Sequence, residues 1–198
     1  MNACMIDLET LDTAPSACVL TLGACAFDLY GTDSPEAIKA DEAACFYRKV
    51  TIESNEAVGR TISGSTVMWW MQQSDDARAS LIEGHHVELR KALIEFNLWW
   101  AGHGVDRIWA KSPDFDCKIM ESAFKGFKIP VPWFFANTRC VRTIQELAYP
   151  DGDRPNFDFG TAHDALDDAI QQAVMVQHCM KRLGIAHVEG RPAAWPHD

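Results

Sequence analysis

Two carboxylates stand two residues apart in Met5-Ile6-Asp7-Leu8-Glu9-Thr10, a short and largely apolar run near the N-terminus. If residues 5–9 form a strand, Asp7 and Glu9 project from the same face of a sheet, because side chains alternate between the two faces. Two like charges this close raise each other's pKa, and a divalent cation is the usual counter-charge. For this stretch alone, the alternative to a metal site is that one carboxylate is buried against an arginine and the other is exposed to solvent.

Length and composition describe a globular protein. The chain has 198 residues, 47% of them hydrophobic and 23% charged, which fits one folded domain and argues against disorder. We expect a single domain over residues 1–198, with a core over about 1–184 and a short tail at 185–198. The longest nearly apolar run, residues 17–27, is too short and interrupted to span a bilayer, and no basic segment precedes it. The sequence therefore predicts a soluble, cytoplasmic protein without a membrane partner.

Cysteine and charge content narrow the classes of function. Seven cysteines without a C-x-x-C pair indicate neither a disulfide framework nor a zinc knuckle, and are typical of small buried residues in a reducing compartment. The net charge of −10 disfavours nucleic acid as a partner, because affinity for phosphates normally comes from lysine and arginine. The segment 105–145 differs, since its seven basic and four acidic residues give a local charge of +3.

Turn residues divide the beginning of the chain into three strands, which predicts an antiparallel meander. Helical spacing and helix caps then alternate with two further short strands. This order predicts one α/β domain with a mixed five-stranded sheet flanked by helices. The expected strands are residues 5–9, 18–29, 44–51, 107–111 and 133–136, and the expected helices are residues 66–73, 75–79, 86–101, 114–124, 139–147 and 162–180.

Two further acidic clusters follow along the chain. Asp114 and Asp116 come directly after the fourth expected strand, so they either line the crevice beyond a strand end or merely begin a helix. Asp164, Asp167 and Asp168 begin the last helix, where they could simply complement the helix dipole. Asp164 and Asp168 share a helix face, so spacing does not decide which aspartate belongs to a site.

In their order, these clusters resemble a known set. An aspartate and a glutamate on a first strand, Phe115-Asp116 at a strand-to-helix junction and H-x-A-x-x-D at 163–168 resemble the DEDDh branch of the DnaQ-like 3′–5′ exonucleases. The resemblance selects Asp168 over Asp164 and Asp167 as the site aspartate. It also assigns His163 to the site, whereas a lone histidine in such a place is more often structural. The matching site residues are Asp7, Glu9, Asp116, His163 and Asp168, with Ala165 matching as well.

A closer resemblance runs from residue 5 to about residue 184. It is to the group that contains phage exonuclease A, exonuclease VIII-like proteins and a mycobacterial-type 3′–5′ exoribonuclease, and it rests on residues 7–10, 65–74 and 109–116 and on the His163 helix. It implies a ribonuclease H-like fold. Ser112-Pro113-Asp114 differs from many DnaQ-like members, which carry asparagine there, and this bears on local substrate contacts.

The resemblance implies a metal-dependent exonuclease that releases nucleoside 5′-monophosphates from single-stranded or overhanging 3′ ends of DNA. Hydrolysis needs a deprotonated water and a place for charge on the leaving oxygen, and two divalent ions about 4 Å apart serve both needs. Oxygen ligands favour Mg²⁺ or Mn²⁺. As the family implies, Asp7 would bridge the ions, Glu9 and Asp168 would complete one shell, Asp116 would hold the second ion, and His163 would act as the base.

Alternatives stay open around this reaction. RNA is the second expected substrate, and a catalytically inactive nucleic-acid-binding module is the alternative from another class. The candidate nucleic-acid contacts are Thr10, Leu11 and Trp69. Trp69-Trp70 either packs in the core or offers one ring to stack on a base, because only one of two adjacent helical residues easily faces the core.

Two smaller expectations concern an interface and a thiol. Trp99-Trp100 has the same two interpretations as the first tryptophan pair, and a subunit interface of a homodimer is the favoured use. Cys117, beside Asp116, is a weak alternative as a nucleophile, since the sequence indicates no environment that would lower the pKa of its thiol.

Overall fold

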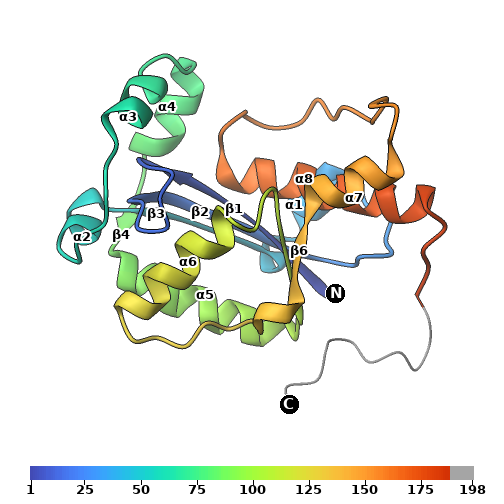
Figure 1. The fold of residues 1–198 in the computed structure, drawn as a ribbon, viewed down its shortest axis with the longest axis horizontal. Coiled ribbons are helices and arrows are strands. Elements are labelled where there is room, and N and C mark those ends of the chain that lie inside the picture. Colours follow the sequence, from blue (N-terminus) through green and yellow to red (C-terminus); the bar gives the residue numbers. More distant parts are fainter. Residues whose placement is uncertain (188–198) are drawn as a thin grey trace.

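The computed structural model describes residues 1–187, in which helices cover both faces of a six-stranded sheet (Figure 1). Most of the expected tail, residues 188–198, lies outside this range. In the described range no helix combines the length and the apolar character needed to cross a bilayer. The strands are β1 (Ala3–Thr10), β2 (Val19–Phe27), β3 (Cys45–Val50), β4 (His86–Val87), β5 (Arg107–Ala110) and β6 (Thr138–Cys140), in the order β4-β3-β2-β1-β5-β6.

Strand β1 lies inside the sheet, with an antiparallel neighbour on one side and a parallel neighbour on the other. The expected meander is confirmed, because β2 pairs antiparallel with both β1 and β3. Strands β5 and β6 then continue the sheet in parallel with β1. Since the carboxyl ends of parallel strands meet at one edge, the acidic end of β1 lies beside the segment that follows β5.

Side-chain alternation along β1 decides which helices the two carboxylates face. Cys4, Ile6 and Leu8 pack into the cluster that includes α5 and α6, whereas Ala3 and Met5 pack with α8 and its neighbours α1 and α7. The second series continues with the side chains of residues 7 and 9, which therefore face α8. The helices are α1 (Pro35–Ala40), α2 (Ile52–Glu56), α3 (Gly64–Trp70), α4 (Asp75–Ile82), α5 (Leu89–His103), α6 (Asp116–Gly126), α7 (Val141–Ala148) and α8 (Ala165–Arg182), with 3₁₀ turns at Glu42–Ala44 and Phe135–Asn137.

A glycine in β2 lets the start of α8 approach the sheet. Gly23 pairs with Asp7 across the β1–β2 ladder, and a Cβ atom added there would lie 2.2 Å from the carbonyl carbon of Ala165. No side chain fits in that space, because real Cβ atoms do not approach other heavy atoms so closely. Gly23 therefore allows the first turn of α8 to lie directly above the acidic end of β1.

The sheet has six strands, and the expected number of five was wrong. Residues 86–87, expected to begin a helix, form β4 and pair in parallel with Lys49 and Val50 of β3. Helix α5 begins at Leu89, whose backbone N–H donates to Ser54 Oγ at 2.9 Å. A strand of two residues shows no alternation, so the hydrophobic pattern does not reveal it.

The expected strand at 133–136 was also wrong. Trp133 is buried, with its ring centroid 5.9 Å from that of Trp100, whereas Phe135 is exposed in the 3₁₀ turn that precedes β6. Aromatic enrichment, which is typical of strands, here anchors a loop in the core. The short helices α1 and α2 were not expected, although Ser34 and Pro35 form an ordinary cap and first residue for α1.

Core packing accounts for the second tryptophan pair. Trp100 is buried, and Trp99 is half-buried with its ring tilted against Phe46 and its Nε1 donating to the carbonyl of Ala43 at 3.1 Å. The homodimer with this pair at its interface stays a prediction. All seven cysteines are free and at least half-buried, as expected of small core residues.

Candidate active site

The carboxylates of β1 are held from two directions. Asp7 is half-buried, and its Oδ1 accepts a hydrogen bond of 2.7 Å from Nε2 of Gln172 on α8. Glu9 is only 8% exposed, with no hydrogen bond to its carboxylate from the described residues. The acidic pair of the sequence is thus a pair of largely buried oxygen donors that face one helix.

Asp116 joins this pair from the other side of β1. It is the first residue of α6 and 3% exposed, and its Oδ1 accepts a hydrogen bond of 3.1 Å from the backbone N–H of Leu8. The helix begins two residues later than expected, because Ser112 to Phe115 form a turn closed by a 2.9 Å backbone hydrogen bond. Asp114 is exposed in that turn and does not line the site.

The three aspartates at the start of α8 have three different roles. Asp164 caps the helix by accepting from the backbone N–H groups of Leu166 and Asp167. Asp167 accepts from Lys39 Nζ at 2.5 Å and from the N–H of Thr161 at 2.9 Å, which ties the preceding loop to α1. Asp168 remains to face β1, so the contacts of the other two decide the choice that spacing left open.

His163 stands beside Asp168 in a left-handed backbone conformation, with φ of 64°. Its N–H donates to Oδ2 of Asp168 at 3.2 Å, and its ring makes an edge contact with Trp69 at a centroid distance of 5.0 Å. One ligand atom each from Glu9, His163 and Asp168 lie within 4.8 Å of one another. The loop before α8 thus brings an imidazole to the carboxylates without placing it on their helix face.

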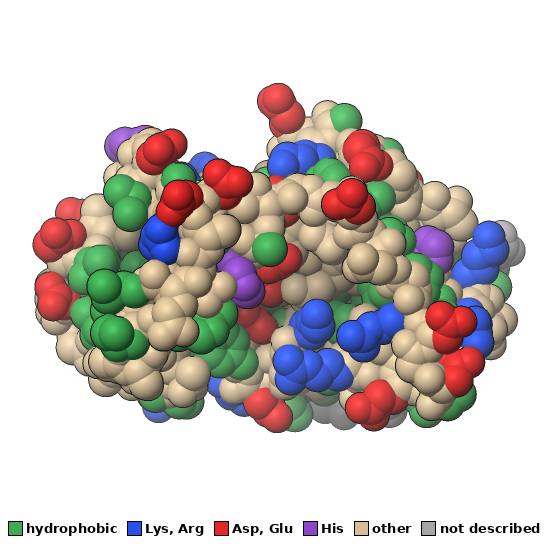
Figure 2. Space-filling view, turned by 90° about the horizontal axis from the view of Figure 1, so that it is seen from above, with side chains coloured by type: hydrophobic (Ala, Val, Ile, Leu, Met, Phe, Trp, Pro, Cys, Tyr) green, Lys and Arg blue, Asp and Glu red, His purple; other side chains and the backbone are tan. Residues whose placement is uncertain are grey.

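These side chains surround one hollow of about 570 Å³, here called the central pocket. Figure 2 shows a histidine and acidic side chains inside a depression of the surface, with basic side chains gathered along one side of it. Every residue expected at the catalytic and metal site lines this pocket, as does Trp69. Its lining is Asp7, Leu8, Glu9, Trp69, Lys111, Phe115, Asp116, Arg142, His163, Asp168, Gln171 and Gln172.

The four carboxylates of the central pocket all have raised pKa values, because they are buried and too little positive charge lies near them. Burial first, and then the charges of Asp116 and Asp168, raise the pKa of Asp7 well above its usual range. Burial and the charge of Asp7 raise the pKa of Glu9 to about 10, and burial raises the pKa of Asp116 to about 7. Burial also raises the pKa of Asp168. The charge of Lys111 acts in the opposite direction on the first and last of these, without offsetting the burial.

Divalent cations fit this donor set. Four carboxylates offer the hard oxygen ligands that Mg²⁺ and Mn²⁺ prefer, and their raised pKa values mean that a bound cation would stabilise the ionised forms. Oε1 of Gln172 is buried without a hydrogen-bond partner, although Nε2 of the same amide is bound to Asp7. A buried acceptor beside a carboxylate cluster suits a hydrated cation, whose water molecules donate hydrogen bonds.

The first tryptophan pair divides into one core ring and one surface ring. Trp70 is 6% exposed, and its Nε1 donates to the carbonyl of Thr10 at 2.9 Å. Trp69 is 42% exposed and lines both the central pocket and a neighbouring hollow of about 360 Å³, here called the aromatic pocket. The aromatic pocket is lined by Leu8, Glu9, Thr10, Thr13, Ser65, Thr66, Trp69, Trp70 and Phe115.

Two of the three expected nucleic-acid contacts, Thr10 and Trp69, therefore line a pocket beside the carboxylates. Leu11 does not line either pocket, because its side chain packs on Cys18, Leu20 and Trp70. It supports the core ring of the tryptophan pair, and its expected contact with nucleic acid is not supported by its position.

Sequence reasoning missed several residues of the central pocket. Gln172 follows Asp168 by four residues on α8, so helical spacing alone places both on one face. Lys111 and Arg142 belong to the basic segment 105–145 but were not assigned to the site. Cys117 is buried in the core, and burial raises the pKa of its thiol, which removes it as a nucleophile.

Comparisons with known proteins find similar nucleases. Residues 2–180 match the model of the family described as the 3′–5′ exoribonuclease Rv2179c-like domain. The exodeoxyribonuclease of Enterobacteria phage T4 is 24% identical over 205 residues, which cover 89% of this chain and 88% of the phage protein.

Two solved structures have a similar fold. Cell-death related nuclease 4 (CRN-4) has a TM-score of 0.59 and 17% identity over 92% of this chain, which spans 64% of the length of that nuclease chain. The nuclease domain of 3′hExo, described as a DEDDh family member bound to rAMP, has a TM-score of 0.57 and 12% identity over 92% of both chains.

Proposed function

Because this chain belongs to the Rv2179c-like 3′–5′ exoribonuclease domain family, we propose that it hydrolyses the last phosphodiester bond at the 3′ end of a single strand with two bound divalent cations. Single-stranded or overhanging DNA is the first candidate substrate, and nucleoside 5′-monophosphates are the products. One observation carries the proposal: four carboxylates with raised pKa and one histidine, from three separate segments of the chain, line a single pocket.

The residues that would hold two Mg²⁺ or Mn²⁺ ions are Asp7, Glu9, Asp116 and Asp168. Bound ions supply positive charge for the leaving oxygen and favour the deprotonation of water. An imidazole nitrogen of His163 accepts the proton of the attacking water, whose oxygen bonds to phosphorus. The bond between phosphorus and the 3′ oxygen of the penultimate nucleotide breaks, and its electron pair stays on that oxygen, which takes up a proton from solvent. The shortened strand therefore keeps a 3′-hydroxyl, and the phosphate leaves with the terminal nucleoside.

The aromatic pocket is the candidate binding position for the terminal nucleoside. It adjoins the carboxylates through Glu9, and the half-exposed ring of Trp69 forms part of its wall. An aromatic ring stacks on any base, so this contact suits an enzyme that removes nucleotides one after another. Thr10 lies at the same wall, and its Oγ1 donates a hydrogen bond of 2.7 Å to the carbonyl oxygen of Asp12, which fixes the backbone of this wall.

RNA is the second candidate substrate. The family description names an exoribonuclease, whereas the phage relative is named for DNA, and the two differ at the 2′-hydroxyl of the sugar. A site that binds a hydroxyl group by hydrogen bonds discriminates strongly against a substrate that lacks it. Parallel assays on the two sugars therefore separate the candidates.

The test offers single-stranded DNA and RNA of equal sequence, each labelled at the 5′ end, with Mg²⁺, Mn²⁺ or EDTA. The proposal predicts a ladder that shortens from the 3′ end only with metal, and no shortening by Asp7→Ala. Asp76→Ala, which removes an exposed carboxylate on α4, is the matched control and should act like wild type. Equal degradation by Asp7→Ala would contradict the site, and binding without shortening under any metal would support the inactive binding module instead.

His163 has two candidate roles that the same preparation distinguishes. As the proton acceptor, its replacement by alanine lowers turnover by about 10²- to 10⁴-fold and leaves the affinity for Mn²⁺ nearly unchanged. As a metal ligand, its replacement lowers that affinity as Asp7→Ala does, and isothermal titration with Mn²⁺ measures the difference. A large loss of Mn²⁺ affinity would contradict the role of His163 as the base.

A further inference from the structure

A third hollow continues the central pocket on the side away from the aromatic pocket. It has a volume of about 640 Å³ and shares Lys111 and Arg142 with the central pocket. We call it the basic groove. It is lined by Lys111, Arg142, Gln145, Glu146, Tyr149, Pro150, Gly152 and Arg154. The aromatic pocket, the central pocket and the basic groove therefore form one continuous depression.

Three cations line the basic groove, and the charges of Lys111 and Arg142 also act on carboxylates of the central pocket. Lys111 follows β5, Arg142 lies in the first turn of α7, and Arg154 lies in the loop between α7 and α8. All three are exposed, and within residues 1–187 none of their side chains makes a hydrogen bond or an ion pair. Elsewhere lysine and arginine side chains do form ion pairs, such as Arg48 with Glu95. One carboxylate, Glu146, also lines the groove and leaves it a net charge of +2.

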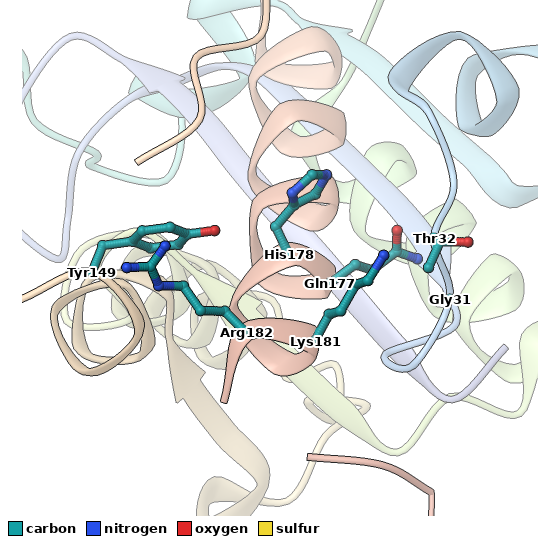
Figure 3. Close-up of a pocket in the computed structure, with 7 residues that line it drawn as sticks. All are labelled: Gly31, Thr32, Tyr149, Gln177, His178, Lys181 and Arg182. Carbon is teal, nitrogen blue, oxygen red and sulfur yellow. The ribbon is translucent and has the colours of Figure 1, made fainter. Parts of the chain in front are cut away.

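Another hollow, at the far end of α8, shows the contrast. Figure 3 shows Arg182 lying against the ring of Tyr149, where its guanidinium carbon is 4.5 Å from the ring centroid. Arg182 also approaches Asp151 at 3.9 Å, and Gln177 bonds to Asp33. Two of the polar side chains that line that hollow, Gln177 and Arg182, are thus already engaged with the protein, unlike the three cations of the basic groove.

The two ends of the depression differ in chemistry, and this difference indicates in which direction a bound strand lies. The aromatic pocket contains no lysine or arginine, whereas the basic groove contains three unpaired cations. An enzyme that releases the 3′-terminal nucleotide needs room for one nucleoside on one side of the broken bond. It needs a path for a chain of phosphates on the other side. In a protein with a net charge of −10, that path requires local positive charge.

We infer that the strand on the 5′ side of the broken bond runs through the basic groove, where Lys111, Arg142 and Arg154 bind its phosphates. This inference rests on the proposed exonuclease function and names the direction in which that site takes its substrate. The groove binds the strand by its phosphates and not by its bases, so it accepts DNA and RNA alike.

The test measures binding of a 5′-fluorescein 12-mer, single-stranded DNA or RNA, by anisotropy across a salt series with Ca²⁺. A phosphorothioate replaces the last linkage to slow hydrolysis. Each phosphate contact contributes about 0.7 to the slope of log K against log salt for single strands. Arg142→Ala and Arg154→Ala should each make this negative slope shallower by about 0.7, and each should weaken binding at 0.1 M salt by about fivefold. Arg154→Lys should restore the slope.

Arg90→Ala is the matched control, because Arg90 is an exposed arginine on α5, which covers the other face of the sheet. It removes the same charge without touching the groove, so its slope should equal that of wild type. Thermal unfolding by circular dichroism verifies that each variant is folded. Equal slopes for Arg154→Ala, Arg142→Ala and Arg90→Ala, in protein that still shortens strands, would overturn the groove and leave the proposed function intact.

Neutral linkages test the direction. Methylphosphonates at the second and third linkages from the 3′ end should weaken binding to wild type and have little further effect on the double variant Arg142→Ala/Arg154→Ala. The same substitution at the 5′ end of the 12-mer should have no effect. An equal loss of binding in wild type and double variant would overturn the inference. Absence of any metal-dependent shortening by wild type would instead overturn the proposed function.

Discussion

Nε2 of Gln172 donates a hydrogen bond of 2.7 Å to Oδ1 of Asp7, across the interface between α8 and β1. This amide orients a carboxylate that has no other hydrogen bond among the described residues, and its own Oε1 is buried without a partner. Such contacts around metal ligands commonly change metal affinity by about 10- to 100-fold. Gln172 is therefore a positioning residue for the proposed metal site.

Gln172→Leu should weaken Mn²⁺ binding by at least about tenfold in isothermal titration. Turnover at saturating Mn²⁺ should recover in part, because the carboxylates themselves remain. Gln72→Leu, which alters an exposed glutamine next to α3, serves as the control and should bind Mn²⁺ like wild type. Unchanged Mn²⁺ affinity in Gln172→Leu would show that the hydrogen bond is only structural.

The tryptophan pair predicts two opposite phenotypes from adjacent positions. Trp70→Ala removes a buried ring and its hydrogen bond to Thr10, so it should lower the free energy of unfolding by about 3–5 kcal/mol. Trp69→Ala should leave that free energy nearly unchanged and weaken binding of a single strand by about 1–3 kcal/mol, because a stacking ring is lost. Urea unfolding and anisotropy measure the two quantities. Equal strand affinity in wild type and Trp69→Ala would exclude stacking on this ring.

Gly23 predicts a steric limit beneath α8. Gly23→Ala places a methyl group 2.2 Å from the carbonyl carbon of Ala165, so the helix start must shift, at a cost of about 1–3 kcal/mol in the free energy of unfolding. Turnover should fall as well, because Asp168 moves with the helix. Gly64→Ala is the control, since no heavy atom lies within 4 Å of a Cβ atom added there. Equal urea midpoints for the two variants would contradict this close approach.

The raised pKa values predict the pH dependence of the metal-free protein. Asp116 has a folded pKa of about 7, above the value near 4 of an unfolded aspartate, so the folded state binds more protons between these values. The contribution of Asp116 to the free energy of unfolding is therefore fully present below pH 4 and is lost as the pH rises through 7, and Glu9 extends this loss toward pH 10. In EDTA, Tm should fall between pH 5 and pH 9.

Two changes should flatten that pH profile. Asp116→Asn removes one titrating group, and saturating Mg²⁺ binds the ionised carboxylates, so stabilisation by metal should grow with pH. Differential scanning calorimetry measures both effects. A metal-free Tm that rises from pH 5 to pH 9 would contradict the assignment of raised pKa values to these carboxylates.

Much of the fold and site could be predicted from the sequence. The resemblance to DnaQ-like 3′–5′ exonucleases is confirmed by the family match, and the α/β, ribonuclease H-like fold by the solved structures of similar fold. Alternation along β1 predicted that Asp7 and Glu9 share a face. Spacing could not separate Asp168 from its neighbours, because the difference lies in tertiary contacts such as the ion pair of Asp167 with Lys39.

What the sequence hid has common physical causes. Strand β4 is too short for alternation to appear, and Trp133 marks a loop anchor with the same aromatic signal as a strand. Lys111 and Arg142 belong to the basic segment 105–145 that the sequence indicated, but tertiary structure alone brings them together with Arg154 in one groove. Residues that meet only through tertiary structure leave no periodic pattern.

The most direct test of the central claim is hydrolysis in water enriched in ¹⁸O, with the products analysed by mass spectrometry. With Mg²⁺ or Mn²⁺ and a single-stranded substrate, the account predicts ¹⁸O in the phosphate of released nucleoside 5′-monophosphates and a 3′-hydroxyl without ¹⁸O on the shortened strand. Asp7→Ala and EDTA should abolish both products. Nucleosides released without phosphate, or ¹⁸O in the 3′-hydroxyl, would contradict attack of water on phosphorus at this site.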